Sequence, residues 1–260
     1  MKITNTAKNR LDLGELALGV GIRQARTADI GKIMKTCGYD WLFIDMEHNS
    51  MSIDTAAQIS VAAQDAGIAP IVRVPGFQHF HASRALDGGA QGVVVPHVDT
   101  PEIAAEMVSN CRYPPAGHRS VTGRLPQVGF EAHPQDEVTR SVNHATLVVV
   151  MVETPTAVEN VEAIAAVPGV DSILVGTNDL CTEMGIPGAV GDPRIQEIME
   201  RVVAACRTHG KHPGLGGVYE PPLMERYIRM GMRLILCGND LTLMMAAAQE
   251  RSARMRAISM

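Results

Sequence analysis

Two acidic residues follow neighbouring apolar segments, and their positions suggest a metal site. Glu153 comes directly after the apolar run 147–152, and Asp179 comes shortly after the apolar run 172–175. The segment between them, 156–167, has the amphipathic pattern of a helix. Two parallel strands joined by a right-handed crossover helix end on the same side of a sheet, so the two carboxylates would lie close together. Carboxylate oxygens are ligands that hard divalent cations prefer.

A structural interpretation of the same two acids is also open. An acid after a strand often caps the next helix or balances the dipole of its first turn. Thr154 and Pro155 already account for a helix start, because proline is favoured at the first helical position. This segment alone therefore predicts either a shared metal site or two acids at helix starts.

Polar residues also follow the other apolar segments. If the segments are parallel strands of one barrel, these residues meet at the mouth where barrel enzymes carry their chemistry. A histidine among acids can move a proton, and an arginine can stabilise a developing oxyanion. The alternatives are a packed strand-end histidine and a salt bridge from Arg73 to Glu47 or Glu153. The set is Arg23, Asp45, Glu47, His48, Arg73, His97, Asn239 and Asp240.

About eight strand–helix units would position these residues. Apolar strands without alternation are typical of a parallel sheet that is covered on its outer face. Eight units predict a (β/α)8 TIM barrel, as a single domain over 1–260 with a long loop at about 112–144. A doubly wound open sheet is the alternative, but the glycines at 19 and 21 do not continue as a dinucleotide fingerprint. The expected strands are 16–20, 41–44, 70–72, 92–95, 147–152, 172–175, 212–216 and 234–237.

Composition excludes several classes of protein. The 260 residues are 46% hydrophobic and carry a formal net charge of -5, which argues against disorder and against a nucleic-acid partner. No apolar run approaches the roughly 20 residues that cross a bilayer, and residues 1–10 lack a signal-peptide core. The five cysteines are scattered, with no CxxC pair, so neither disulfides nor a thiolate zinc site is expected. We therefore expect a cytoplasmic protein without a membrane partner.

Five short motifs stand in order along the expected strand ends. They are 45–48 (DMEH), 72–75 (VRVP), 113–119 (YPPAGHR), 152–154 (VET) and 175–180 (VGTNDL). Together they resemble the HpcH/HpaI aldolase family of class II, metal-dependent pyruvate aldolases, within the phosphoenolpyruvate/pyruvate barrel superfamily. The resemblance runs from about Gly19 to Ala247.

The resemblance implies how metal and substrate would be held. Glu153 and Asp179 would be the ligands of a divalent cation, with Mg²⁺ or Mn²⁺ expected and Co²⁺ as a further option. The backbone amides of Asn178 and Asp179 would hold the carboxylate of pyruvate. The substrate would be a small-molecule 2-oxo acid.

The resemblance also implies the roles of the remaining site residues. His48 would be the catalytic acid/base, assisted by Asp45 and by Asp87. Arg73 would steady the enolate oxygen and the aldol hydroxyl. A Schiff-base lysine is not needed, because a metal and an arginine can together withdraw charge from the enolate.

The implied activity is that of a carbon–carbon lyase that cleaves or forms 4-hydroxy-2-oxo acids through a pyruvate enolate. Two alternatives stay open: an oxaloacetate-type decarboxylase on the same metal site, and a catalytically inactive metal-binding barrel. The resemblance further implies a homo-oligomer, a hexamer built from dimers, in which the last helix is exchanged with a neighbouring subunit. It places the loop 113–124 near a pocket at a subunit boundary.

The chain departs from the family pattern around the expected substrate. Members commonly have Gly-Pro-Ala-Asp where this chain has 176–179 (GTND), and a glutamine where it has Met151. They often have a tryptophan after the first strand, where this chain offers Arg23. The resemblance therefore does not define which substrate is used, and we hypothesise that Arg23 binds a carboxylate on the aldehyde-side fragment.

Overall fold

Eight parallel strands form one closed barrel in a computed structural model that describes residues 3–259. Each strand pairs with the next along the chain, and the last pairs back with the first. The predicted (β/α)8 TIM barrel is therefore confirmed. The expected domain limits, 1 and 260, lie outside the described residues and stay a prediction. The strands are β1 (Ala17–Ile22), β2 (Trp41–Asp45), β3 (Ala69–Arg73), β4 (Gly92–Val95), β5 (Leu147–Val152), β6 (Ser172–Gly176), β7 (His212–Gly216) and β8 (Leu234–Asn239).

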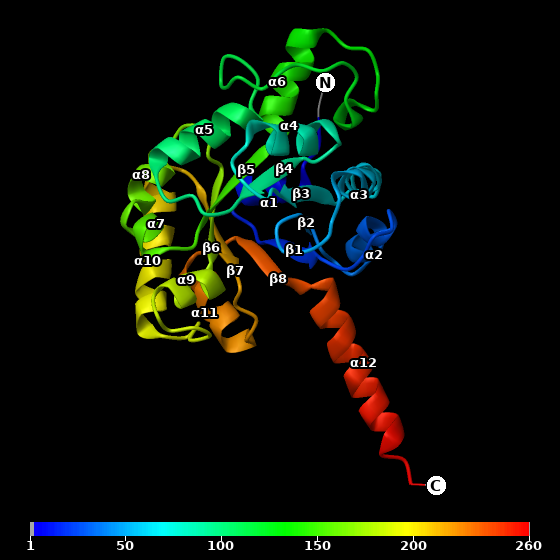
Figure 1. Cartoon of the computed structure of the whole chain (residues 1–260), viewed down its shortest axis with the longest axis vertical. Helices are drawn as coiled ribbons and strands as arrows, with labels where there is room; N and C mark the ends of the chain where they lie inside the picture. The colour runs from blue at the N-terminus through cyan, green and yellow to red at the C-terminus, as the bar shows by residue number, and fades with distance from the viewer. Residues whose placement is uncertain (1–2, 260) are drawn as a thin grey trace.

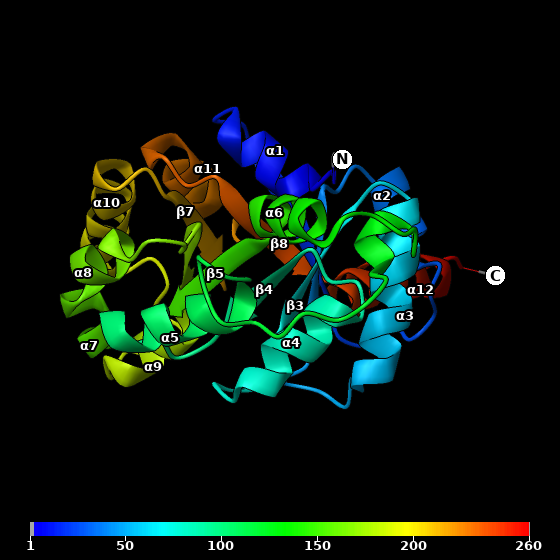
Figure 2. The same ribbon diagram turned by 90° about the horizontal axis from the view of Figure 1, so that it is seen from above.

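Helices surround the barrel, as Figures 1 and 2 show from two directions. None of the helices among the described residues is both long and apolar enough to cross a membrane. The helices are α1 (Thr6–Asp12), α2 (Ile30–Thr36), α3 (Ile53–Asp65), α4 (His79–Asp87), α5 (Pro101–Cys111), α6 (Gln135–Ala145), α7 (Pro155–Glu159), α8 (Val161–Ala166), α9 (Thr177–Glu183), α10 (Pro193–Thr208), α11 (Pro221–Met230) and α12 (Asp240–Arg256), with a short 3-10 turn η1 (Pro126–Val128).

Two stretches differ from the sequence expectation. The single helix expected at 156–167 is split into α7 and α8 at Asn160, whose side-chain amide donates a hydrogen bond to the Asp99 carbonyl at 2.8 Å. The long loop expected at about 112–144 ends earlier, because its last part folds as α6. Acids in the first turn favour this helix start, and Val142 is buried beneath it.

The core has two layers. One lies between the strands and the surrounding helices, and the other fills the barrel interior. Trp41 lies in the interior layer, and its indole N–H donates to the Ala17 carbonyl at 3.1 Å. Gly19 makes room for this ring, since a Cβ there would lie 2.5 Å from Trp41 Cδ2. The interior is therefore a packed core that closes the barrel beneath its mouth.

The last helix, α12, projects away from the barrel (Figure 1). It begins with a capping box, in which the Asn239 side chain accepts from the Thr242 amide. No residue of this helix is buried in the single chain. Its exposed residues include Leu243 and Met244. The expected exchange of this helix with a neighbouring subunit stays a prediction.

Candidate active site

A cavity of about 240 Å³ opens at the mouth of the barrel, where the strands end. Its lining brings together side chains and glycines that follow or end seven of the eight strands. Apolar residues, Phe43, Met151, Leu174 and Leu236, also line it. The charged and polar lining residues are Arg23, His48, Arg73, Thr177, Asn178, Asp179, Tyr219 and Asn239.

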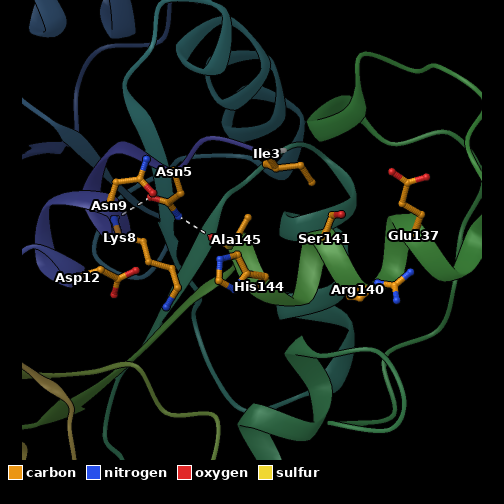
Figure 3. Close-up of a pocket in the computed structure, with 10 residues that line it drawn as sticks. All are labelled: Ile3, Asn5, Lys8, Asn9, Asp12, Glu137, Arg140, Ser141, His144 and Ala145. Carbon is orange, nitrogen blue, oxygen red and sulfur yellow. Dashed lines mark hydrogen bonds between the residues drawn. The ribbon is translucent and has the colours of Figure 1, made fainter. Parts of the chain in front are cut away.

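A larger cavity, of about 510 Å³, lies elsewhere, between α1 and α6 (Figure 3). Lys8, Arg140 and His144 line it together with Asp12, so its walls carry both signs of charge. None of the residues predicted for catalysis, metal or substrate lines this cavity. The barrel mouth is therefore the candidate active site, despite its smaller volume.

Asp45 is the most heavily hydrogen-bonded acid of the mouth. It ends β2 directly opposite Arg73, because the register of β2 and β3 pairs these two residues. Arg73 binds it with two nitrogens, Nε to Oδ1 at 3.0 Å and Nη2 to Oδ2 at 2.6 Å. The backbone amides of Glu47 and His48 donate to Oδ1 as well. Burial alone would raise the pKa of Asp45, but these hydrogen bonds and the charge of Arg73 hold it below its ordinary value.

Arg73 is fixed on three sides. Besides Asp45, it forms an ion pair with Glu47, Nη1 to Oε2 at 2.7 Å. Its guanidinium also lies over the ring of Phe43, 5.0 Å from the ring centre. The side chain is almost fully buried and still lines the cavity. The salt bridge to Glu47 that the sequence left open is therefore present, and it holds the guanidinium at the mouth.

Glu153 directly follows β5 and is 1% exposed. One hydrogen bond to its carboxylate is observed, from the backbone N–H of His97 to Oε2 at 2.9 Å. His97 adopts a positive φ of 53°, an uncommon conformation for a residue other than glycine. Burial raises the pKa of Glu153 to about 6; the His97 amide and ring oppose this, and the charges of Asp179 and Glu47 add to it.

Gly176 is the residue that lets the Glu153 carboxylate occupy this position. A Cβ on Gly176 would overlap Oε1 of Glu153 and would lie 2.6 Å from its Cγ. Val152 pairs with Val175 in the register of β5 and β6, which brings Glu153 beside Gly176. The carboxylate therefore lies across the bare end of β6, toward the first turn of α9 where Asp179 stands.

The residues at the mouth fit a divalent cation. Among the described residues, the carboxylates of Glu153 and Asp179 have no basic side chain within ion-pair distance except the His97 ring, whose Nδ1 lies 3.5 Å from Oε2 of Glu153. Among residues 3–259, no group of three or more His, Cys, Asp or Glu side chains is arranged to hold a metal. A bound cation would thus take two protein carboxylates and complete its shell with water or substrate oxygens.

The sequence profile of the HpcH/HpaI aldolase/citrate lyase family matches residues 23–247. The chain belongs to this family. The resemblance drawn from the five motifs is therefore confirmed.

Named relatives agree with the HpcH/HpaI assignment. The 4-hydroxy-4-methyl-2-oxoglutarate aldolase of Hapsidospora irregularis is 37% identical, over 98% of this chain and 96% of that protein. The 2-keto-3-deoxy-L-rhamnonate aldolase of Escherichia coli O157:H7 is 32% identical, over 96% and 93% of the two chains. The crystal structure of an HpcH/HpaI aldolase from Desulfitobacterium hafniense superposes with a TM-score of 0.93 at 26% identity, over 98% of both chains. The predicted class of enzyme, an aldolase acting as a carbon–carbon lyase, is confirmed.

Seven of the eight predicted site residues of this HpcH/HpaI aldolase lie together at the mouth: Arg23, Asp45, His48, Arg73, Glu153, Asn178 and Asp179. Their individual roles stay predictions. The His48 ring lines the cavity and is 47% exposed. Its nearest carboxylate is that of Glu47, 3.8 Å from Nε2, whereas Asp45 contacts His48 through the backbone amide.

Asp87 lies apart from the others within one chain. It is the last residue of α4, just before β4 begins, so it stands at the end of the barrel opposite the mouth. Its carboxylate accepts a hydrogen bond from Nη2 of Arg119 at 2.6 Å. The Arg119 side chain is fully buried, under the ring of Tyr113. Any help from Asp87 to His48 would therefore have to come from a second copy of the chain.

Sequence reasoning missed two residues of the mouth. Tyr219 follows β7, a strand rich in glycine and proline, and was not among the predicted site residues. Thr177 was noted only as a departure from the family pattern. Its hydroxyl is buried, has no hydrogen-bond partner, and belongs to a residue that lines the cavity. The signal for both was their place just after a strand end.

Proposed function

We propose that this aldolase is divalent-metal-dependent and cleaves or forms 4-hydroxy-2-oxo acids, with pyruvate as the keto-acid product. The observation that carries the proposal is the charge balance of the mouth. The carboxylates of Asp45 and Glu47 are paired with the guanidiniums of Arg23 and Arg73, whereas those of Glu153 and Asp179 have no arginine or lysine beside them among the described residues. One divalent cation held by Glu153 and Asp179 would balance these two carboxylates.

The relatives' names support the class of substrate. One is named for 4-hydroxy-4-methyl-2-oxoglutarate and another for 2-keto-3-deoxy-L-rhamnonate. Both compounds are 2-oxo acids, and they differ in the part of the molecule beyond the keto acid. The substrate proposed here shares the keto-acid part.

Each residue of the mouth has a task in this reaction. Glu153 and Asp179 would hold Mg²⁺, Mn²⁺ or Co²⁺, which supplies Lewis-acid polarisation of the substrate's 2-oxo group. His48 accepts the proton of the 4-hydroxyl group as the bond between C3 and C4 breaks and the electron pair passes into an enolate. Arg73, held in place by Asp45 and Glu47, donates hydrogen bonds to the enolate oxygen. A proton added at C3 then yields pyruvate.

The remaining site residues orient the substrate. The amides of Asn178 and Asp179 are proposed to bind its carboxylate, and the free hydroxyl of Thr177 offers a further hydrogen bond beside them. Asp45 acts in this scheme by holding Arg73. Arg23 stays our proposed contact for the part of the substrate beyond the reacting bond.

The decisive experiment follows the methyl protons of pyruvate in D2O. We expect exchange that requires Mg²⁺ or Mn²⁺ and stops with EDTA, because exchange needs only the enolate and not the acceptor. No exchange at any metal concentration would indicate a catalytically inactive barrel. Pyruvate release from 4-hydroxy-2-oxo acids, compared by kcat/KM with carbon dioxide release from oxaloacetate, then separates the aldolase from a decarboxylase.

We also propose a homo-oligomer, a hexamer built from dimers, in which α12 packs on a neighbouring subunit. Three observations support this. The helix buries none of its own residues, and its start carries the exposed apolar side chains Leu243, Met244 and Met245. The loop after α5 exposes Val121 and Phe130 as well. Contiguous exposed apolar residues of this kind are typical of protein interfaces.

We place the protein in the cytoplasm, without a nucleic-acid or membrane partner. All five cysteines are free, and three of them, Cys111, Cys181 and Cys206, are buried. Free cysteines are typical of a reducing compartment. The net charge of -5 also disfavours binding to a polyanion.

A further inference from the structure

Arg23 is a guanidinium at the mouth with unused hydrogen-bond donors. Its Nε donates to Oδ2 of Asp45 at 3.1 Å, and its side chain is 39% exposed. Among the described residues, no hydrogen bond from its two terminal nitrogens is observed. Arg73 differs, because both of its terminal nitrogens already contact carboxylates, those of Asp45 and Glu47. Arg23 therefore offers all the N–H groups of its terminal nitrogens to a ligand, whereas each terminal nitrogen of Arg73 keeps one N–H beyond its carboxylate contact.

The loop that carries Arg23 is held in place. Asp240, the first residue of α12, accepts the backbone N–H of Arg23 at 3.0 Å and that of Ala25 at 2.7 Å. Asp45 then fixes the guanidinium from the other side. The side chain therefore reaches the cavity from an anchored backbone, which lowers the conformational entropy lost when a ligand binds.

Tyr219 lines the same cavity from the loop after β7. Burial raises the pKa of its hydroxyl, while the charges of Arg23 and Arg73 and the Gly217 amide lower it by less. The hydroxyl thus keeps its proton at neutral pH and lies in the field of both guanidiniums. The Gly217 amide lies at the acceptor side of this hydroxyl, so its own proton can still be donated to an anion.

The space beside these two residues comes from glycines. Gly21, Gly216, Gly217 and Gly238 line the cavity at the ends of β1, β7 and β8. A Cβ at Gly217 would lie 3.1 Å from Nδ2 of Asn178, and one at Gly21 would lie 2.9 Å from Cβ of Asn239. These glycines therefore leave room for the side chains of Asn178 and Asn239, which line the same cavity as Arg23 and Tyr219.

We propose that Arg23 and Tyr219 together bind a second carboxylate of the substrate, at the end distant from the keto acid. The substrate is then a dicarboxylate, and these two residues determine specificity for it. The inference rests on the proposed function, since it extends a 2-oxo acid already held near Glu153 and Asp179. An arginine with two free terminal nitrogens suits a carboxylate, and a phenolic hydroxyl supplies a further hydrogen bond to it.

A structural role is the competing interpretation for each residue. Arg23 could serve only to tie the loop after β1 to Asp45, and Tyr219 could serve only to cover the cavity. If the two residues have only a structural role, their substitution should weaken the binding of every ligand alike. If they contact a carboxylate, their substitution should weaken the binding only of ligands that carry the second carboxylate. The test therefore needs a matched pair of ligands.

The experiment measures binding by titration calorimetry, with Mg²⁺ or Mn²⁺ present, for 2-oxoglutarate and 2-oxopentanoate. These two 2-oxo acids have five carbons each and differ in the distal group, a carboxylate in one and a methyl in the other. We expect the unaltered protein to prefer 2-oxoglutarate. In Arg23→Gln, the affinity for 2-oxoglutarate should fall about 10- to 100-fold, the effect of a charged hydrogen bond. The affinity for 2-oxopentanoate should stay within about twofold.

Two further variants complete the design. Tyr219→Phe should lower the affinity for 2-oxoglutarate about fivefold, the effect of one hydrogen bond. The affinity for 2-oxopentanoate should not change. Arg140→Gln is the control, because it removes one exposed positive charge that lines the cavity between α1 and α6 and not the mouth. It should alter neither affinity, and circular dichroism should show all three variants folded.

Every outcome decides the proposal. Equal weakening of both ligands in Arg23→Gln, no preference for 2-oxoglutarate in the unaltered protein, or no binding of either ligand overturns it. Failure of the proposed function would give a separate result, the absence of metal-dependent proton exchange into pyruvate in the unaltered protein. A preference for 2-oxoglutarate that depends on Arg23 supports the second-carboxylate site even in that case.

Discussion

At the scale of single residues, two buried carboxylates at the mouth behave in opposite ways. Asp45 receives two guanidiniums and two amides, and its pKa is lowered. Glu153 receives one amide, stands near other acids, and has a pKa raised to about 6. Both side chains are buried, so their hydrogen-bond and charge partners decide whether the pKa is raised or lowered. Asp45 is thereby an anchor for arginine, while Glu153 remains available to a cation.

Glu153→Gln should stabilise the metal-free protein at neutral pH. The folded-state pKa of about 6 lies above the ordinary value of 4.5, so the folded protein binds a proton more tightly than the unfolded chain. Below about pH 4.5 both states are protonated, and the group has no effect on stability. As pH rises through 6, its ionisation destabilises the fold by about 2 kcal/mol, at 1.36 kcal/mol per pKa unit.

Urea unfolding after EDTA treatment, at pH 4.5 and pH 7.5, measures this effect. The stability of Glu153→Gln relative to the unaltered protein should increase by about 2 kcal/mol between the two pH values. Added Mg²⁺ or Mn²⁺ should then stabilise only the unaltered protein, since a ligand stabilises the state that binds it. A pH-independent difference would contradict the raised pKa.

Gly176→Ala should disturb the metal site more than the fold. The added Cβ would overlap the Glu153 carboxylate, so this side chain must move. We expect the apparent metal affinity of the enzyme to fall about 10- to 100-fold, as for other changes that displace a ligand, with a stability loss of about 1–3 kcal/mol from overpacking. Activity titrated with Mn²⁺ measures the first effect, and urea unfolding the second.

Gly216→Ala is the matched control for this variant. Gly216 pairs with Gly176 in the register of β6 and β7, and also lines the cavity. A Cβ there would lie 3.4 Å from the nearest atom, the Val175 carbonyl oxygen, which is an ordinary contact. Equal metal affinities in the two alanine variants would show that Gly176 does not make room for a ligand.

At the scale of elements, the ends of the chain's strands and helices bring distant residues together. The loop after β4 places the His97 amide on Glu153, and the start of α12 holds the loop after β1 through Asp240. The remainder of α12 projects away from the barrel, and none of its residues is buried (Figure 1). Its first turns are therefore part of the site's support, and its exposed face is suited to contact another subunit.

The double variant Leu243→Glu/Met244→Glu should dissociate the proposed oligomer. Both side chains are exposed in the single chain, so their replacement leaves the barrel core intact. Two charges would have to be buried if the helix packs on a neighbour, which is strongly unfavourable. Light scattering after size-exclusion chromatography should give a mass near the 27.9 kDa of one chain.

Gln249→Glu serves as the comparison, because it adds one charge at an exposed polar position of the same helix. It should keep the mass of the unaltered protein. A monomeric mass for the unaltered protein, or an unchanged mass for the double variant, would refute the role of α12 in assembly.

At the scale of the whole molecule, the residues that stabilise the barrel and the residues proposed for catalysis lie in different places. The interior layer around Trp41 closes the barrel, whereas the charged residues gather at the mouth, beyond the strand ends. Asp87 and Arg119 pair at the opposite end. The packing of the core does not depend on the residues at the mouth, so these residues can be substituted without loss of the fold.

Removal of the metal should therefore abolish activity without unfolding the barrel. Trp41 is the only tryptophan and is fully buried, so its fluorescence reports on the interior. EDTA should leave its emission maximum and the far-ultraviolet circular dichroism unchanged, and Mg²⁺ or Mn²⁺ should restore activity. A red shift of the emission on chelation would show instead that the metal holds the fold together.

The sequence by itself determined the barrel and the class of enzyme. Its apolar runs predicted seven of the eight strands, because burial on both faces leaves a continuous apolar pattern that is local in the chain, while β7 (HPGLG) was predicted as a weaker strand. Residues that follow those strands had to meet at one mouth, so Glu153, Asp179, His48 and Arg73 could be named in advance. The motifs at these positions identified the family, which the profile match confirms.

Only the tertiary structure decided which side chains bind one another. The register of β2 against β3 sets Asp45 opposite Arg73, so its carboxylate holds arginine while the His48 ring lies nearest to Glu47. Register and loop paths join residues far apart in the chain, and local patterns do not encode such pairings. The same holds for Tyr219, which lines the same cavity as Arg23 only because β7 and β1 both end at the mouth of a closed barrel.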